Sequence, residues 1–338
     1  MPGDAAARSA TAAIRTKARK CLRYPIVILP VGLAIVFVAL SSTTPRPRGK
    51  QRSAFGSSLM SDLVDRIETA LAERFGERFH AEVAPAGREE VARMAAHRVC
   101  RRYQARDVPP DLVRLLCACA LSAPTKSDLQ QADILIIREK TKRHAIGALL
   151  PEMPWLIDAP VFVIFLANGR RTPQIAEMRG KPFPNDHLDL FFNAAVDAAI
   201  VLAGFVHAAE AMGLGCCPIS VIRDHAQAIA DMFALPDKIV PVAGLTLGWP
   251  AEAGAISPRL PLSVTVHEER YGETDLAAKI DAYDRRRAAT RPYRKQREPE
   301  RFGTADFYGW SEDKARQYAS PQRAGFGAFV REQGFVLE

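Results

Sequence analysis

The segment 188–212 constrains the fold of this 338-residue chain more than any other stretch. Apolar residues recur in it at helical spacing and cover most of the circumference of the predicted helix. The polar residues Asp189, Asn193, Asp197 and Glu210 interrupt this apolar band. A helix with so little polar surface must be buried, either in a large core or against a second subunit. The sequence thus predicts a buried long helix, and it does not decide whether the protein core or a second subunit buries it.

Three further apolar runs predict strands, at residues 132–138, 159–166 and 240–247. The run 159–166 is continuous, which is typical of a strand covered on both faces of its sheet. Residues 168–186 contain Gly, Pro and charge without a period, and they predict a long surface loop.

Helical spacing and capping residues predict several more helices. They run from Ser61 to near Gly76, over residues 89–96, from Pro109 to before Pro124, from Asp224 to Phe233, and over residues 276–289. In the helix before Pro124, the side chains expected to face inward are Leu112, Leu115, Leu116 and Cys119.

The N-terminal part differs from the rest in charge. The formal net charge is +8, and many basic residues precede Met60, where Asp4 is the one acidic residue. The excess charge therefore lies mostly outside the expected body, and it does not predict nucleic-acid binding. We expect a basic segment over residues 1–59, with a disordered linker at 45–58, and a folded domain over residues 60–338.

Residues 24–40 are almost wholly apolar and contain Pro25, Pro30 and Gly32. Three interpretations stay open: an uncleaved membrane anchor, the apolar region of a signal peptide, and translated upstream sequence that is not part of the native protein. The six cysteines show neither metal-ligand spacing nor a secreted disulfide framework, so we expect no metal site and a reducing compartment.

Two segments carry the chemistry. Residues 97–103 begin with His97 and Arg98 and include Arg101, so they crowd several potential cations together. Residues 122–130 contain Thr125, Lys126, Ser127 and Gln130, which offer hydroxyls, an ammonium and a carboxamide. Guanidinium and imidazolium groups together with neutral donors are what a phosphate dianion requires, so the two segments predict an anion-binding site.

The order of these segments resembles the FMN-dependent nitroreductase family, most closely its NADPH-preferring, oxygen-insensitive branch and the related flavin reductases. Two more motifs in the family's order support the resemblance: Gly213-Leu214-Gly215-Cys216-Cys217-Pro218-Ile219, and Ser257-Pro258-Arg259-Leu260-Pro261-Leu262. The likeness extends from about Met60 to the C-terminus.

The resemblance implies an α+β protein of nitroreductase-like fold, with a central, mostly antiparallel sheet flanked by helices. It also implies a homodimer with two FMN sites at the interface, reduced by NADPH or NADH. By position in the motifs, the implied cofactor-binding residues are His97, Arg98, Arg101, Thr125, Lys126, Ser127, Gln130, Cys217, Pro218, Ile219 and Arg259. The loop 125–127 is expected to reach the neighbouring subunit's cofactor, and backbone N–H groups near Cys217 to serve flavin N5.

The chain departs from the family pattern at several positions. Val99 replaces a serine, Ser257 replaces the lysine of a Lys-x-Arg motif, and Met153 replaces a glutamine. The sequence Cys-Pro-Ile-Ser replaces Tyr-Ile-Gly-Gly, which puts substrate range in doubt. The arginines of residues 285–291 either bind the 2′-phosphate of NADPH or form a solvated helix end.

We therefore expect an FMN-dependent oxidoreductase that passes two electrons from NAD(P)H to nitroaromatic, quinone or flavin acceptors by a ping-pong route, without a dedicated catalytic side chain. The alternatives are a flavin-binding module without turnover and a membrane-tethered flavin redox partner. The expected partners are a small-molecule substrate and a second copy of the chain, with no nucleic acid. The expected location is the cytoplasm or, if residues 24–40 anchor the chain, the inner membrane.

Overall fold

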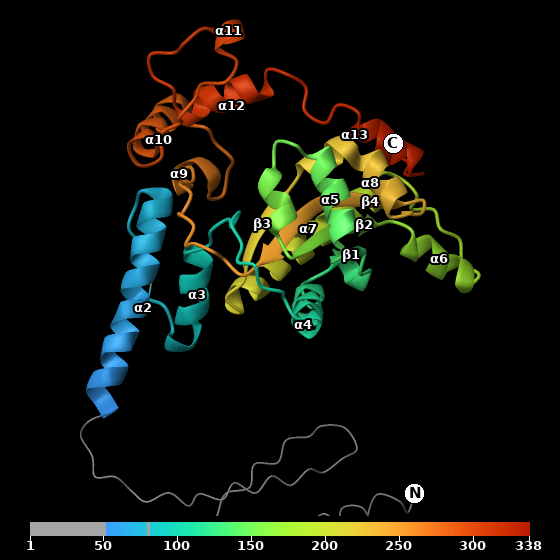
Figure 1. Ribbon diagram of the computed structural model, residues 1–338, viewed down its shortest axis with the longest axis horizontal. Helices are drawn as coiled ribbons and strands as arrows, with labels where there is room; N and C mark the ends of the chain where they lie inside the picture. The colour runs from blue at the N-terminus through green and yellow to red at the C-terminus, as the bar shows by residue number, and fades with distance from the viewer. Residues whose placement is uncertain (1–51, 80–81) are drawn as a thin grey trace, which may run out of the picture. The chain divides into compact units, whose positions relative to one another are not determined.

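An antiparallel sheet of four strands, in the order β1-β2-β4-β3, lies at the centre of the computed structural model (Figure 1). The structure describes residues 52–79 and 82–338, and residues 53–338 form one body. The strands are β1 (Ala132–Ile137), β2 (Val161–Asn168), β3 (Gly215–Ile219) and β4 (Ile239–Gly248). The three expected strands are confirmed, as is the antiparallel α+β class; β3 was not expected as a strand.

Strand β2 explains why its sequence is apolar without interruption. It pairs with β1 on one side and β4 on the other, and every one of its residues is buried. Alternate side chains enter two different hydrophobic clusters, so that Val163 and Phe165 lie in one and Phe162 and Ile164 in the other. The sheet is therefore covered on both faces at β2, as the sequence predicts.

Helix α7 (Leu188–Ala211) covers one face of the sheet. Its residues Ala198, Val201 and Phe205 pack with Phe165 of β2, and the rings of Phe165 and Phe205 meet edge-to-face at 5.6 Å. It is also the one described helix long and apolar enough to cross a membrane, but this side of it is part of the core. The long helix is thus confirmed, and it is buried on the face that packs on the sheet, while Leu188, Phe192 and Val196 on its other face are exposed.

The remaining helical elements surround this centre. They are α2 (Arg52–Phe75), η1 (Pro85–Gly87), α3 (Arg88–Ala95), α4 (Pro110–Leu121), η2 (Lys126–Asp128), α5 (Lys140–Leu149), η3 (Pro154–Asp158), α6 (Arg171–Met178), η4 (Val221–His225), α8 (Ala226–Met232), α9 (Leu262–Thr265), α10 (Leu276–Thr290), α11 (Pro299–Phe302), α12 (Trp310–Tyr318) and α13 (Phe326–Glu332). Helix α5 and turns η3 and η4 contribute to the second cluster, on the other face of the sheet.

Helix α2 corrects the expected N-terminal boundary. It is already helical at Arg52, so Ser61 lies in its interior and does not cap it. The linker expected at 45–58 is wrong for residues 52–58, and a boundary at 59/60 falls within this helix. The Gly and Ser of this stretch favour helices weakly, which is why the sequence suggested a later start. The apolar run 24–40 lies outside the described residues.

Three smaller expectations also fail. In α4 the buried stripe is Val113, Leu116 and Ala120, whereas Leu115 and Cys119 are exposed, so the helix is rotated from the predicted phase. The expected loop 168–186 contains α6, which has Pro in its first turn and buries none of its residues, so no period marks it. Asp224 lies inside η4 and does not cap α8.

Candidate functional site

His97 follows α3 in an extended segment that crosses the end of β3. The Cys100 N–H donates to the Cys216 carbonyl at 2.8 Å, and this bond fixes the segment to the outer edge of the sheet. The His97 Nδ1 atom lies 2.6 Å from Oε1 of Glu210, near the end of α7. Because Nδ1 is engaged by this carboxylate, the Nε2 atom of the ring is the one left for a ligand.

His97 and Arg259 line the same cavity, which has a volume of about 580 Å³ and is called the basic cavity below. Its basic side chains are Arg74, His97, His207 and Arg259, and Phe75, Tyr283 and Trp310 add aromatic rings. No carboxylate belongs to its described lining. A cavity with several potential cations and no acid is suited to a phosphate or another anion.

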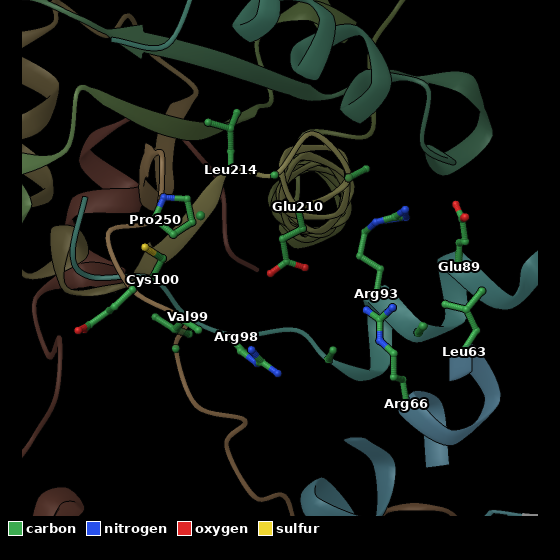
Figure 2. A pocket seen from close by; sticks show the side chains of 18 residues that line it. Leu63, Arg66, Glu89, Arg93, Arg98, Val99, Cys100, Glu210, Leu214 and Pro250 are labelled. Carbon is green, nitrogen blue, oxygen red and sulfur yellow. The ribbon is translucent and has the colours of Figure 1, made fainter. Parts of the chain in front are cut away.

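Arg98 faces a different cavity, of about 590 Å³, which we call the mixed cavity. Neighbouring side chains of an extended segment point in opposite directions, which separates Arg98 from His97. Figure 2 shows Arg66, Arg93 and Arg98 around this cavity, with the Glu210 carboxylate pointing toward its middle. The structure therefore does not place Arg98 with the other predicted phosphate ligands.

Arg101 and Cys217 form a second group, on the side of the sheet away from α7. The Arg101 guanidinium lies 5.7 Å from the ring centroid of Trp155. Burial raises the pKa of the Cys217 thiol to about 11, although the charge of Arg101 and its hydrogen bond to Cys217 act in the opposite direction. Cys216 is fully enclosed, and its pKa is also raised by burial. Both groups are thus protonated thiols at neutral pH.

Cys217, Pro218 and Ile219 belong to β3, the edge strand next to β4. The side chains of Cys217 and Ile219 are buried in the core, while Pro218 is exposed. Backbone groups alternate between the two edges of a strand, so Pro218 faces the same outer edge as Cys216. Because proline has no N–H, a backbone donor to flavin N5 in this segment has to come from another residue than Pro218.

The loop 125–130 is fixed to α7 by Asp197, whose side chain is buried. The Thr125 hydroxyl donates to Asp197 Oδ2 at 2.6 Å, and the backbone N–H groups of Lys126 and Gln131 donate to the same carboxylate at 3.1 Å. The Gln130 N–H in turn donates to the Thr125 hydroxyl oxygen at 2.9 Å. Thr125 therefore acts first as an internal anchor of this loop.

The exposed part of the same loop has unusual backbone geometry. Ser127, Asp128 and Gln130 have φ of 50°, 57° and 53°, in the left-handed region that side chains disfavour. The side chains of Lys126, Ser127 and Gln130 are exposed. Such strain persists only where surrounding contacts impose it, and the Asp197 carboxylate supplies them here.

The predicted residues therefore do not all meet within one chain. Glu210, which holds His97, and Asp197, which holds the loop 125–130, are separated by about 20 Å along α7, at a rise of about 1.5 Å per residue. His97 and Arg259 come together, as do Arg101 and Cys217. Thr125, Lys126, Ser127 and Gln130 lie at the other end of this helix segment.

The arginine run at the end of α10 is largely occupied inside the chain. Arg286 donates to the carbonyls of Arg74 and Arg259, the latter at 2.6 Å. Arg287 stacks 4.2 Å from the ring centroid of Tyr293, and Arg291 donates to Ser257 Oγ at 3.1 Å. These contacts favour a structural role for the run over binding of a nicotinamide 2′-phosphate.

Three residues of this site were missed as site residues in the sequence: Arg74, Asp197 and Glu210. Asp197 and Glu210 were visible as carboxylates in an apolar helix, and a buried carboxylate requires donors. That rule could have predicted partners for both of them, though not which partners. Nothing in the local sequence distinguishes Arg74 from the other arginines of α2.

The nitroreductase family model matches residues 94–249, and the model of the nitroreductase family C-terminal domain matches residues 257–338. The NAD(P)H-type FMN reductase of Bacillus subtilis is 29% identical over 253 residues, which are 74% of this chain and 99% of the relative. The oxygen-insensitive NADPH nitroreductase of Salmonella typhimurium is 31% identical over 193 residues, 56% of this chain and 78% of the relative.

A solved structure from Bacillus megaterium, NfrA2, superposes with a TM-score of 0.67 at 30% identity, and the match covers 74% of this chain and 99% of that one. The hypothetical oxidoreductase YcnD from Bacillus subtilis also gives a TM-score of 0.67, at 28% identity. The motifs, the antiparallel sheet and these matches lead to one conclusion. The chain belongs to the nitroreductase family.

Proposed function

We propose that this chain is an FMN-dependent oxidoreductase that takes two electrons from NADPH or NADH and passes them to nitroaromatic, quinone or flavin acceptors. Relatives named as an FMN reductase, an oxygen-insensitive NADPH nitroreductase and an NADPH-flavin oxidoreductase support this activity. The observation on the chain itself that carries it is the basic cavity, where His97 and Arg259 meet without a carboxylate in the lining.

The donor chemistry of the basic cavity fits the phosphate of FMN. Arg259 is exposed, and its guanidinium makes only long contacts of 3.4 Å, with the carbonyls of Ser257 and Pro258. A phosphate can therefore engage it without breaking an ion pair. His97 offers Nε2, because its Nδ1 atom already contacts the Glu210 carboxylate. These two residues would hold the phosphate.

The residues near β3 fit the flat end of the same cofactor. Bound flavin supplies reversible two-electron chemistry at N5. Arg101 provides a cation beside Cys217, which can stabilise negative charge on a reduced ring. The small, protonated thiols of Cys216 and Cys217 add no charge of their own. Donor and acceptor would use the same space in turn, which is the physical basis of a ping-pong route.

A second copy of the chain would complete the site. The outward face of α7 carries an apolar stripe of Leu188, Phe192, Val196, Ala199 and Ala203, and Phe192 is 60% exposed. A stripe of this kind marks an interaction surface. In a twofold dimer the loop 125–130 of one protomer would reach the cofactor of its partner. Both groups of predicted ligands, the loop and the pair His97 and Arg259, would then contact one cofactor.

We place the folded body in the cytoplasm, where reduced nicotinamide is available. The alternative of an anchored protein depends on residues 24–40. The natural acceptor depends on side chains that differ from the family pattern around Cys217.

The proposed activity is tested by spectroscopy of the purified full chain. We expect it to bind FMN, to show the visible flavin absorption bands, and to lose them when NADPH or NADH is added without oxygen. A nitroaromatic or quinone should then restore the bands, which excludes a flavin-binding module without turnover. Protein that binds no added FMN contradicts the proposal.

Variants connect this activity to the basic cavity. His97→Ala with Arg259→Ala should weaken FMN binding at least about tenfold, because two charge-assisted phosphate contacts are lost. His144→Ala is the matched control, since His144 is exposed on α5 outside the cavity lining. Its dissociation constant for FMN should stay within about twofold of wild type.

A further inference from the structure

Helix α2 contributes to the basic cavity although it precedes the family match. The helix ends at Phe75, whereas the nitroreductase family model begins to match at residue 94. The match to the Bacillus subtilis FMN reductase covers 99% of that relative but only 74% of this chain. Nevertheless, Arg74 and Phe75 at the end of α2 line the basic cavity together with His97 and Arg259. An element outside the family match thus forms one wall of the site.

The side chain of Arg74 holds two separate ligand segments. Only 7% of Arg74 is exposed. Its Nη2 atom donates to the His97 carbonyl at 2.6 Å and to the Ala95 carbonyl at 3.1 Å, and its Nη1 atom donates to the Ser257 carbonyl at 3.3 Å. Nε also donates to Ala95, at 3.2 Å. One planar group therefore connects the segment of His97 with the segment of Arg259.

The backbone of Arg74 makes the same connection from the other side. The Arg259 N–H donates to the Arg74 carbonyl at 2.7 Å. Arg286 reaches the same carbonyl and also the carbonyl of Arg259. The Arg74 carbonyl lies at the end of α2 and needs a donor from outside, since the helix cannot satisfy it itself. The Arg259 N–H thus caps the C-terminal end of α2, and the Arg74 side chain in turn binds the Ser257 carbonyl of the same segment.

Among the residues that the structure describes, no carboxylate forms a direct ion pair with Arg74, although the charges of Glu73 and Glu210 act on it from further away. All four of its side-chain hydrogen bonds go to neutral carbonyl oxygens. Burial and the nearby charge of Arg259 lower its pKa, and the carboxylates of Glu73 and Glu210 only partly oppose this, although arginine stays protonated at neutral pH. A buried cation without a direct ion pair, next to a second cation, is stabilised further by an anion bound beside both of them. The four bonds leave one Nη1 hydrogen of the five guanidinium donors for such an anion.

We propose that Arg74 is a positioning residue for the cofactor phosphate, which aligns His97 with Arg259 and adds a fixed positive charge to the wall of the cavity. This inference rests on the proposed function, because it takes the anion to be the phosphate of FMN. It implies that α2 contributes to cofactor binding, although this helix precedes the part of the chain that matches the family model.

Riboflavin distinguishes a phosphate effect from a general loss of structure, because it has the same ring and ribityl chain as FMN but no phosphate. Full-length Arg74→Gln should bind FMN at least about tenfold more weakly than wild type, measured by quenching of flavin fluorescence, while riboflavin affinity stays within about twofold. Arg74→Lys keeps the charge but not the planar fork, so its loss for FMN should be smaller. Arg66→Gln is the matched control, as an arginine of α2 that lines the mixed cavity.

The outcomes separate this inference from the proposed function. If wild-type protein binds no FMN, the proposed function fails. If wild type binds FMN and Arg74→Gln binds it equally well, the positioning role alone is wrong. An equal loss of FMN and riboflavin affinity in both Arg74→Gln and Arg74→Lys would show a purely structural arginine and also overturn the inference. Should Arg74→Gln not fold, the ratio of the two affinities in Arg74→Lys decides.

Discussion

At the scale of single residues, burial determines what the vicinal cysteines can do. Cys216 and Cys217 are both buried, and burial raises both pKa values. A thiol is nucleophilic as its thiolate, so neither is poised for redox chemistry at neutral pH. They serve as small apolar side chains in β3, which agrees with the absence of a metal-ligand or disulfide spacing in the sequence.

The raised pKa of Cys217 predicts a pH dependence of stability. An unfolded cysteine loses its proton near pH 9, whereas folded Cys217 does so near pH 11. Its contribution is therefore fully present below about pH 9 and is lost as the pH rises to about 11. Two pKa units correspond to about 2 to 3 kcal/mol. Urea unfolding of wild type should lose that much more free energy over this window than Cys217→Ala; parallel curves would contradict the assignment.

At the scale of elements, α7 organises the site through its two buried or half-buried carboxylates. Asp197 holds the loop 125–130, and Glu210 holds His97. The rest of the inward face packs on the sheet, so the helix fixes both ends of the predicted ligand set to the core. Of the polar residues that interrupt this apolar helix, Asp197 and Glu210 are thus the two that hold predicted site residues.

Removing the Asp197 carboxylate should release the loop. Asp197→Ala leaves the Thr125 hydroxyl and two backbone N–H groups without their acceptor, and we expect a loss of about 2 to 4 kcal/mol in the free energy of unfolding. Asp189→Ala, on the exposed first turn of α7, should cost less than about 1 kcal/mol. Chemical denaturation measures both. An Asp197→Ala loss no larger than that of the control would remove the anchoring role.

Some helices and strands could be predicted from the sequence, and others could not. Strand β2 and helix α7 were predictable because each has a strong apolar pattern set by burial. Strand β3 was missed, because a short run with two cysteines and a proline has no strand period. The basic cavity was partly predictable, since the motifs gave His97 and Arg259. Arg74 was not, because its role depends on the packing of α2 against residues far along the chain.

At the scale of the whole molecule, the predicted cofactor-binding residues lie in separate groups within one copy of the chain. His97 and Arg259 line the basic cavity, while Thr125, Lys126, Ser127 and Gln130 lie near the far end of the α7 segment between Asp197 and Glu210. An exposed apolar stripe runs along the same helix. The dimer that we propose would explain both observations, because the loop of each protomer would then serve the cofactor of the other.

Phe192→Glu tests this explanation, because it places a charge within the apolar stripe, at its most exposed large side chain. We expect wild-type protein to be a dimer by light scattering and Phe192→Glu to be largely monomeric at micromolar concentration, since burying an unpaired carboxylate opposes association. The monomer should also bind FMN at least about tenfold more weakly, because the partner's loop is lost. Met178→Glu, at a 78% exposed apolar residue of α6, is the control and should stay dimeric. A wild-type monomer that binds FMN tightly would show that the loop 125–130 has no part in the site.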